Sequence, residues 1–259
     1  MKIAVAIKQV PDTETKVVIG PDGRSINDSS VTYVVNPYDE YALEEALRIR
    51  EAQGGGEVTV VTLGPARATQ ALRTCLAVGA DKAVHVTDES PAGNDPLFVA
   101  RVLAAVMKEI GPDLILTGKY AVGSDNQAVG VMLAELMGIP HVAVVTKLEL
   151  QEGRLVAQRE IEGALEIQEA SLPCVICAQK GLNDPRYANL KGIMAAKKKP
   201  IESRTPADLG IDASAAAVTW EKLELPPAKA PGKILKADAD AGGTARELVR
   251  LLHEEANVI

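Results

Sequence analysis

The sequence predicts an α/β fold, in which a parallel β-sheet carries helices on both faces. Three observations lead to this prediction. Over residues 1–150, short apolar runs alternate with segments of helical periodicity. The apolar runs lack polar alternation, which is typical of strands buried on both sides. Strands that alternate with helices form a parallel sheet with right-handed crossover connections.

Five apolar runs mark the expected strands of this sheet. The first begins almost at Met1, and turn residues such as Gly64-Pro65 end the second. The expected strands span residues 2–7, 58–63, 82–86, 113–117 and 142–145. A hairpin is also expected over residues 16–26, because Gly20-Pro21-Asp22-Gly23 is a strong turn signal between two short apolar runs.

Helices are expected between the strands, and two of them have clear start signals. Asn36 precedes Pro37, and Asp95 precedes Pro96. In each pair the first side chain can cap a helix, and the proline fits the first helical turn. Asp39 then complements the helix dipole. Two further helices are expected over residues 66–78 and 126–137.

The pattern changes after about residue 147. Strand-like segments at 147–151, 154–161, 164–170 and 175–179 follow one another with only short breaks, which indicates an antiparallel excursion that returns to the sheet. Residues 181–203 are polar and irregular. From about residue 205 the chain is rich in Ala, Pro and Lys, a composition that favours an extended arm. We therefore expect a nucleotide-binding-type domain over 1–200 and an arm over 201–259.

The arm ends in an expected docking element. Residues 238–256 contain an expected helix with one apolar face, formed by Ala245, Leu248, Val249 and Leu252. An extended arm that ends in an amphipathic helix indicates docking, either on the chain's own domain or on another subunit.

Composition narrows the functional classes. The chain has 28 basic and 35 acidic side chains and a formal charge of −7, so a nucleic-acid-binding role is not expected. Its apolar runs are shorter than the roughly 18–20 residues that cross a bilayer, so we expect no membrane insertion. Three cysteines in 259 residues favour a reducing cytoplasm over a disulfide framework.

The cysteine and histidine positions argue against redox or metal chemistry. Cys174 and Cys177 match a CxxC spacing, but in a strand they point to opposite faces. They lack the helix N-terminus that activates such thiols. Cys75 lies on an apolar helix face. We expect all three to be structural. The histidines are isolated from one another along the chain, so we expect no metal site; they are His85, His141 and His253.

The strongest candidate site is the glycine-containing stretch at 117–127, which joins an expected strand to a helix. Doubly wound sheets place ligands at such carboxyl edges. Gly118 and Gly123 let backbone amides approach a phosphate, and the helix start adds a positive dipole. Ala6 and Leu63 come at the ends of the first two strands, and Asn36 at a helix start, all expected at the same edge. A simple connector remains an alternative, since neither a P-loop nor a GxGxxG pattern is present.

Several separated segments resemble the beta, or small, subunit of electron-transfer flavoproteins, in order and over essentially the whole chain. They are Val5-Ala6-Ile7-Lys8-Gln9-Val10-Pro11-Asp12, Asn36-Pro37-Tyr38-Asp39-Glu40, Leu43-Glu44-Glu45-Ala46, Gly118-Lys119-Tyr120-Ala121, Arg159-Glu160-Ile161-Glu162-Gly163, and the stretch 183–194 followed by Ala196-Lys197-Lys198.

The resemblance implies a Rossmann-like domain of the adenine nucleotide alpha hydrolase-like type. It implies a heterodimer with an alpha subunit that holds most of the FAD near the interface, and a structural AMP in this subunit. Such a carrier is not an enzyme in its own right. It accepts electrons from flavin dehydrogenases, such as acyl-CoA dehydrogenases of fatty acid β-oxidation, and passes them to a membrane quinone oxidoreductase.

By the same resemblance, particular residues receive roles. Thr13 falls where the family approaches the flavin. Leu190, in a recognition loop at about 183–199, anchors partner dehydrogenases, and Glu160 contacts the flavin domain. The AMP site maps to Ala6, Asn36, Leu63, Gly118, Lys119, Tyr120, Ala121, Val122, Gly123, Ser124, Asp125, Asn126, Gln127, Ala128 and Val129.

Two alternatives stay open at this point. A bifurcating branch of the family oxidises NADH and holds a second FAD in place of AMP. Its loop carries two acidic residues, one apart, and then a glutamine; here Gly123 and Ala128 depart from that pattern and Asp125 agrees with it. The other alternative is an adenine-nucleotide-binding sensor that forms homo-oligomers, which leaves residues 183–259 without a role.

Overall fold

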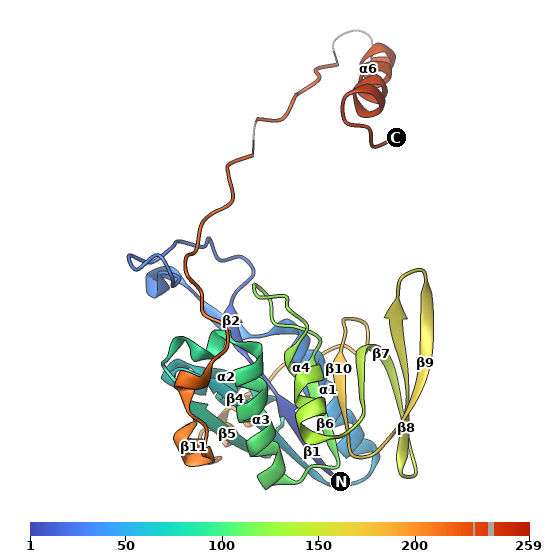
Figure 1. The fold of residues 1–259 in the computed structure, drawn as a ribbon. Helices are drawn as coiled ribbons and strands as arrows, with labels where there is room; N and C mark the ends of the chain where they lie inside the picture. The colour runs from blue at the N-terminus through green and yellow to red at the C-terminus, as the bar shows by residue number, and fades with distance from the viewer. Residues whose placement is uncertain (230, 238–240) are drawn as a thin grey trace. The chain divides into compact units, whose positions relative to one another are not determined.

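The computed structural model describes residues 1–229, 231–237 and 241–259 (Figure 1). The chain divides into two compact units, Met1–Leu223 and Glu224–Ile259. The first unit contains the sheet and its helices. The second is an extended segment followed by one helix.

Nine strands form the main sheet of the first unit, counted over the described residues, in the order β11-β5-β4-β1-β6-β10-β7-β8-β9. All neighbours from β11 to β7 run parallel, and β7, β8 and β9 are antiparallel. The strands are β1 (Lys2–Ala6), β4 (Glu57–Gly64), β5 (Lys82–Thr87), β6 (Leu114–Gly118), β7 (His141–Gln151), β8 (Arg154–Ile161), β9 (Ala164–Ser171), β10 (Cys174–Ala178) and β11 (Ile201–Arg204).

The predicted α/β class and the antiparallel excursion are confirmed. The five expected parallel strands form as β1, β4, β5, β6 and β7. β7 continues without a break into the excursion, because its first half pairs with β10 and its second half pairs with β8. β10 then returns between β6 and β7.

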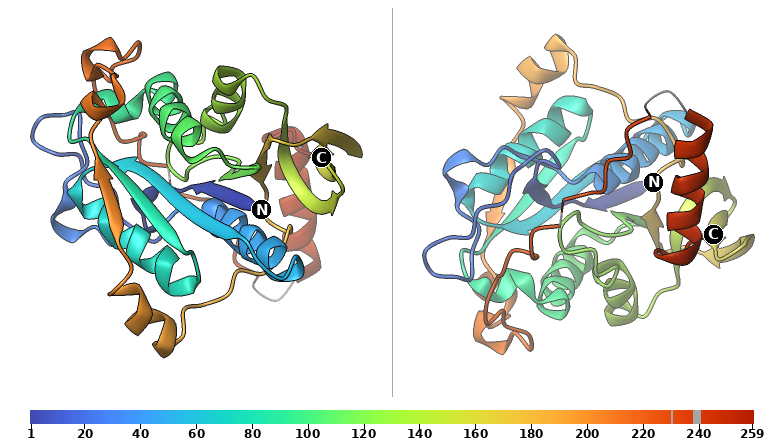
Figure 2. Two further views of the ribbon diagram at one scale, coloured as in Figure 1. Left: turned by 90° about the horizontal axis from the view of Figure 1, so that it is seen from below. Right: turned by 90° about the horizontal axis from the view of Figure 1, so that it is seen from above.

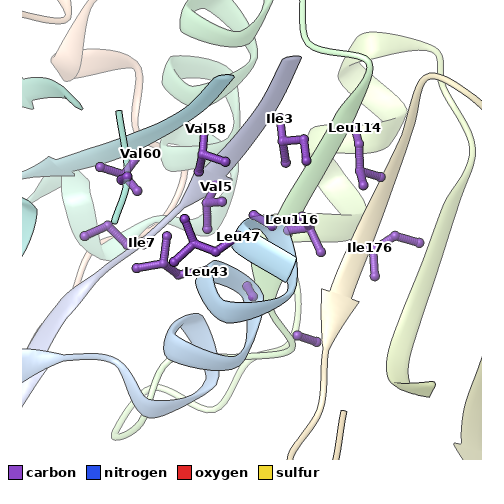
Figure 3. Close-up of a cluster of buried hydrophobic side chains, with 14 of the residues drawn as sticks. Ile3, Val5, Ile7, Leu43, Leu47, Val58, Val60, Leu114, Leu116 and Ile176 are labelled. Atoms are coloured by element: carbon purple, nitrogen blue, oxygen red, sulfur yellow. The ribbon is translucent and has the colours of Figure 1, made fainter. Parts of the chain in front are cut away.

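Helices cover both faces of the sheet, as Figure 2 shows in its left view. α1 (Pro37–Ala52) and α2 (Thr69–Val78) lie on one face, and α3 (Pro96–Ile110) and α4 (Val129–Met137) lie on the other. Alternate residues of β1 pack into the two resulting cores. Ile3 and Val5 belong to the same core as Leu43 and Leu47 of α1 (Figure 3), while Ala4 belongs to the core on the α3 side.

The cysteines lie in these cores as expected. Cys174 belongs to the core under α1 and α2, and Cys177 to the core under α3 and α4. Burial raises the pKa of the Cys174 thiol to about 12 and that of Cys177 to about 11. Cys75 is buried as well, and burial raises its pKa. Thiols with raised pKa values are poor nucleophiles, so their role is packing.

The predicted hairpin at residues 16–26 forms in a short version. Ile19 and Ile26 make an antiparallel bridge, and the amide of Gly20 donates to the carbonyl oxygen of Ser25 at 2.8 Å. A separate two-stranded sheet, which the sequence analysis did not expect, forms from β2 (Gln9–Pro11) and β3 (Tyr33–Val35). The carboxylate of Asp22 accepts hydrogen bonds from the amides of Arg24 and Ser25. These bonds close the turn locally, so extended strand pairing is not needed to satisfy its backbone.

Residues 181–203 contain structure that the sequence analysis missed. α5 (Leu190–Ala196) begins at Asn189, whose side chain accepts the amide of Gly192 at 2.8 Å. α5 packs on α2, and a Cβ on Gly192 would collide with the carbonyl oxygen of Ala77. Arg73 of α2 donates to the carbonyl oxygens of Ala196 and Lys199 at 2.7 and 2.6 Å. The loop around 183–199 is therefore fixed to the domain.

β11 changes the division of the chain. It pairs in parallel with β5 from Ile201↔Ala83 to Arg204↔Val86, so residues 201–204 belong to the sheet. The sequence analysis divides the chain at residue 200, whereas the first compact unit runs to Leu223. The polar composition of the strand, Ile-Glu-Ser-Arg, hid it, because Ile201 is its one apolar residue and the central Glu202 and Ser203 are exposed.

The second unit confirms the predicted final helix. α6 (Ala241–Glu254) forms within the expected range, whose first part, residues 238–240, lies outside the described residues. Leu248 and Val249 of its apolar face are 48% and 54% exposed. Arg250 pairs with Glu247 and Glu254 along the helix surface. Within the described ranges, no helix combines the length and apolar character that crossing a bilayer requires.

Candidate functional site

A pocket opens at the carboxyl ends of β1, β4 and β6. Its empty volume is about 880 Å³, including the part open to solvent. The parallel strands converge there, at the sheet edge where the sequence analysis expects the site. Nine of the predicted residues line it: Ala6, Leu63, Gly118, Lys119, Tyr120, Ala121, Ser124, Asn126 and Val129.

The loop between β6 and α4 has an unusual backbone. Gly123, Asp125 and Gln127 adopt positive φ angles of 89°, 46° and 51°, while Ala128 is right-handed. Within the loop, the amide of Asp125 donates to the carbonyl oxygen of Ala121 at 3.0 Å, and the amide of Ala128 donates to Oδ1 of Asn126 at 3.4 Å. The left-handed residues explain why α4 begins at Val129 and not at Asn126, as the sequence analysis expected.

The N-terminus of α4 faces the pocket without a capping side chain. Ala128 stands at the cap position, and among the described residues no side chain caps this end. The first amides of a helix have no intrahelical partner, and they carry the positive end of the dipole. Val129 and Gly130 line the pocket. This end is therefore suited to a phosphate or another anion.

Asn36 acts through the loop and does not cap α1. Its Nδ2 donates to the carbonyl oxygen of Tyr120 at 2.9 Å, and its Oδ1 accepts the amide of Val122 at 3.1 Å. The side chain is fully buried. The cap that the sequence predicts is wrong because both polar atoms are used by the loop. Asn36 therefore holds the loop in position but does not itself line the pocket.

Asp39 was missed as a site residue and lies in the pocket wall. Its Oδ2 accepts the amide of Lys8 at 2.7 Å and its Oδ1 accepts the amide of Gly118 at 2.9 Å. Burial raises the pKa of Asp39 to about 7, against the opposing effect of these hydrogen bonds. Burial also lowers the pKa of the Lys8 ammonium group. One feature of the sequence could have identified Asp39. It is a carboxylate in the first turn of a helix that begins at the sheet edge.

Two tyrosines, Tyr38 and Tyr120, and Lys119 lie together where the loop leaves β6. The ring centroids of Tyr38 and Tyr120 are 4.4 Å apart, and their hydroxyl oxygens are 2.9 Å apart. The Lys119 Nζ lies 4.8 Å from the Tyr120 centroid and 5.3 Å from that of Tyr38. The hydrogen bond to Tyr120 raises the pKa of Tyr38. Lys119 thus adds a positive charge to the lining of the pocket.

Comparison with known proteins identifies the family. A family model described as "Electron transfer flavoprotein domain" matches residues 24–209. The chain belongs to the electron transfer flavoprotein family. It is 41% identical over 262 residues to the "Electron transfer flavoprotein subunit beta" of Bacillus subtilis (strain 168), with 100% of each chain covered.

Two further relatives carry the same subunit name. The one from Bradyrhizobium diazoefficiens is 39% identical over 259 residues, again with 100% of each chain covered. The human one is 37% identical over 254 residues and covers 97% of this chain and 99% of its own. The resemblance stated from the sequence is confirmed over the full length.

The remaining predicted site residues lie outside the pocket lining. Thr13 is exposed on the turn that follows β2. Glu160, near the end of β8, accepts a hydrogen bond from Nε2 of Gln179 at 3.1 Å. Leu190, the first residue of α5, is 77% exposed, so it is not tucked against its own domain. Other predicted loop residues outside the lining set are Val122, Gly123, Asp125, Gln127 and Ala128.

Leu190 belongs to an exposed apolar group on and beside α5. Tyr187 is 96% exposed, Ile193 44% and Met194 57%. Sequence reasoning singled out Leu190 alone, because α5 was not expected and the helical spacing of Leu190, Ile193 and Met194 was not recognised. We call these four residues the α5 apolar group.

Proposed function

We propose that this chain is the beta subunit of a heterodimeric electron transfer flavoprotein that binds AMP in the pocket. The observation that carries the proposal is the loop at 118–130, whose left-handed residues lead into the uncapped N-terminus of α4. The first residues of α4, Val129 and Gly130, line the pocket, and their amides at the uncapped helix end can bind a phosphate group. Like its relatives, the chain would work as a carrier subunit and not as an independent enzyme.

The pocket residues fit an adenine nucleotide. One part is polar and contains the loop amides and Lys119. The other part is apolar, with Ala6, Leu63 and Val99 in its lining. A phosphate matches the first part, and a planar base matches the second. This division supports a nucleotide over an inorganic anion.

The loop composition favours AMP over a second FAD. Gly123 and Ala128 stand where the bifurcating branch carries an acidic residue and a glutamine, and Asp125 alone matches that branch. A beta subunit with AMP would contribute structure, while the FAD of the alpha subunit would supply the redox chemistry. In that arrangement the exposed turn at Thr13 would approach the flavin, and Glu160 would contact the flavin domain.

The electron donors and acceptor follow from the same role. Flavin dehydrogenases, such as acyl-CoA dehydrogenases, would deliver electrons, and a membrane quinone oxidoreductase would receive them. The α5 apolar group supports this assignment, since it offers an exposed anchor on a helix that is fixed to α2. A reducing compartment such as the cytoplasm suits Cys75, Cys174 and Cys177, all of which are free thiols.

Removal of the arm tests the subunit role. Because the first compact unit ends at Leu223, deleting residues 226–259 should leave that unit folded, with its melting temperature nearly unchanged. The exposed Leu248 and Val249 of α6 should then be missing from the interface. We expect the alpha subunit no longer to co-purify with the truncated chain. Unchanged co-purification would contradict docking through the arm. The full-length variant Leu248→Ser/Val249→Ser separates loss of the helix face from loss of the whole arm.

A further inference from the structure

The segment 217–223 is fixed at both ends to the domain. At one end, the amide of Ala217 donates to Oδ2 of Asp95 at 2.7 Å. Asp95 is buried, and its Oδ1 caps α3 by accepting the amide of Leu97 at 3.0 Å. At the other end, the amide of Leu223 donates to the carbonyl oxygen of Gly23 at 2.8 Å. We call this segment the strap.

A second contact secures the far end of the strap. Nε of Arg24 donates to the carbonyl oxygen of Glu221 at 3.0 Å. The strap therefore runs from the start of α3 to the turn around residue 23, with hydrogen bonds on both sides of Trp220. Its path is set by these bonds, although its own residues contribute little to either core.

Trp220 is the strap residue that lines the pocket. It is the single tryptophan of the chain and is 39% exposed. Asn94 and Pro96, which flank the strap's partner Asp95, line the same pocket. A large aromatic side chain held at a pocket wall, and left partly open to solvent, has apolar surface that a ligand can cover.

We propose that Trp220 forms an aromatic wall that contacts the base of the bound nucleotide. The N-terminus of α4 binds the phosphate of the same nucleotide. The inference rests on the proposed nucleotide-binding function and extends it to base recognition. The apolar part of the pocket, including Leu63 and Leu103, receives the planar ring, and the indole packs against it. A flat aromatic side chain stacks on purine rings and contributes nothing to phosphate binding.

This division predicts different ligand responses. AMP reaches both the loop amides and Trp220, whereas ribose 5-phosphate reaches only the phosphate end. Loss of the indole should weaken AMP binding by roughly 10- to 100-fold, as for other base–aromatic contacts. The affinity for ribose 5-phosphate should stay the same. Trp220→Phe keeps an aromatic face and should retain most of the AMP affinity.

The experiment uses the co-purified heterodimer after its nucleotide has been removed. AMP and ribose 5-phosphate are titrated into the wild type, Trp220→Ala, Trp220→Phe and Val218→Ala, and the melting temperature of each nucleotide-free complex is recorded. Val218 lies on the same strap, is 47% exposed and is not among the pocket-lining residues, so its variant is the matched control. It should bind AMP like the wild type.

Fluorescence gives a second readout that does not depend on activity. The difference in emission between the wild type and Trp220→Phe isolates the signal of Trp220 from tryptophans of the alpha subunit. AMP should change this difference signal, and ribose 5-phosphate should not.

Two results would overturn the inference in distinguishable ways. If Trp220→Ala bound AMP with unchanged affinity and AMP did not change the Trp220 emission, the role of Trp220 in base binding would be refuted. The proposed nucleotide site itself would be unaffected. Absence of AMP binding in the wild-type complex would contradict the proposed function itself, and the inference with it.

Discussion

The carboxylate of Asp39 accepts the backbone amide of Gly118 at 2.9 Å. This bond joins the first turn of α1 to the end of β6, where the loop of the candidate site begins. The second oxygen of Asp39 holds the amide of Lys8, so three segments meet at one buried carboxyl group. The start of the loop is therefore set by packing that lies behind the pocket.

Replacement of Gly118 by alanine should damage this junction. An added Cβ would lie 2.7 Å from Cβ of Tyr38 and would also collide with Oδ1 of Asp39. Because backbone and a buried carboxylate cannot move away cheaply, we expect a loss of about 1–3 kcal/mol in the free energy of unfolding. The complex should also lose AMP. Gly232→Ala, where a Cβ meets open space, is the control and should change neither quantity.

The raised pKa of Asp39 predicts a pH dependence of stability. Between about pH 4 and pH 7 the folded chain holds a proton on Asp39 that the unfolded chain has released. The contribution of Asp39 to the free energy of unfolding therefore falls as the pH rises through this range, and it levels off above it. Asp39→Asn removes the titration. The stability of the wild type minus that of the variant, from urea unfolding at several pH values, should decrease from pH 4 to pH 7. A difference that rises over this range would contradict the assignment.

Arg186 should hold the segment that leads to α5. Its guanidinium group contacts Glu44 at 2.8 Å and Glu51 at 2.6 Å. Glu44 is nearly buried, and Arg48 is its other cationic partner. We expect Arg186→Ala to cost about 2 kcal/mol in urea unfolding, between the values for surface and buried ion pairs. Arg154→Ala is the control.

The ionisation of Glu44 decides how the stability lost in Arg186→Ala depends on pH. Burial pushes the pKa of Glu44 up, but the hydrogen bonds from Arg186 and Arg48 outweigh it, so the net pKa is below the ordinary value. The ion pair therefore stabilises the chain at neutral pH and is lost as the pH falls through the folded-state pKa. Arg154 pairs with Glu169, and both side chains are more than half exposed, so its loss should cost less than about 1 kcal/mol. Equal costs for the two arginines would contradict a structural role for Arg186.

Leu190→Ala should separate partner binding from folding. The side chain is 77% exposed, so its truncation should change the free energy of unfolding by less than about 0.5 kcal/mol. Burial of a leucine in a partner's pocket contributes about 1.5–3 kcal/mol, so the affinity for the cognate dehydrogenase should fall roughly 10- to 100-fold. Electron transfer measured against carrier concentration gives this affinity. Val17→Ala, at another exposed apolar site, is the control and should leave the affinity for the dehydrogenase unchanged. A large loss of stability with unchanged affinity in Leu190→Ala would refute the role of Leu190 as an anchor.

The sheet could be predicted because its strands carry a local signal. β1 and β4 are continuous apolar runs, and a strand that is buried on both faces needs no partner to be recognised. β11 is the opposite case. Its sequence of Ile-Glu-Ser-Arg has little apolar character, and its pairing with β5 depends on contacts more than 100 residues away in the chain. Pairing of that kind leaves no local pattern.

The sequence predicted where the candidate site lies but not its backbone geometry or its side-chain contacts. Gly118 and Gly123 pointed to the loop, because glycine often marks a close backbone approach. The left-handed geometry of Asp125 and Gln127 was not foreseeable, since neither residue type requires it. Asp39 resembled an ordinary dipole partner, because only the fold brings the Gly118 amide to it. Trp220 was hidden in a segment whose composition indicates an arm.

The nucleotide and flavin content of the purified heterodimer tests the central claim most directly. The complex is precipitated with acid, and the released nucleotides are separated and quantified against the protein. We predict one AMP and one FAD for each heterodimer, with the AMP lost in Gly118→Ala. Two FAD and no AMP would contradict the proposed site and assign the pocket to a second flavin.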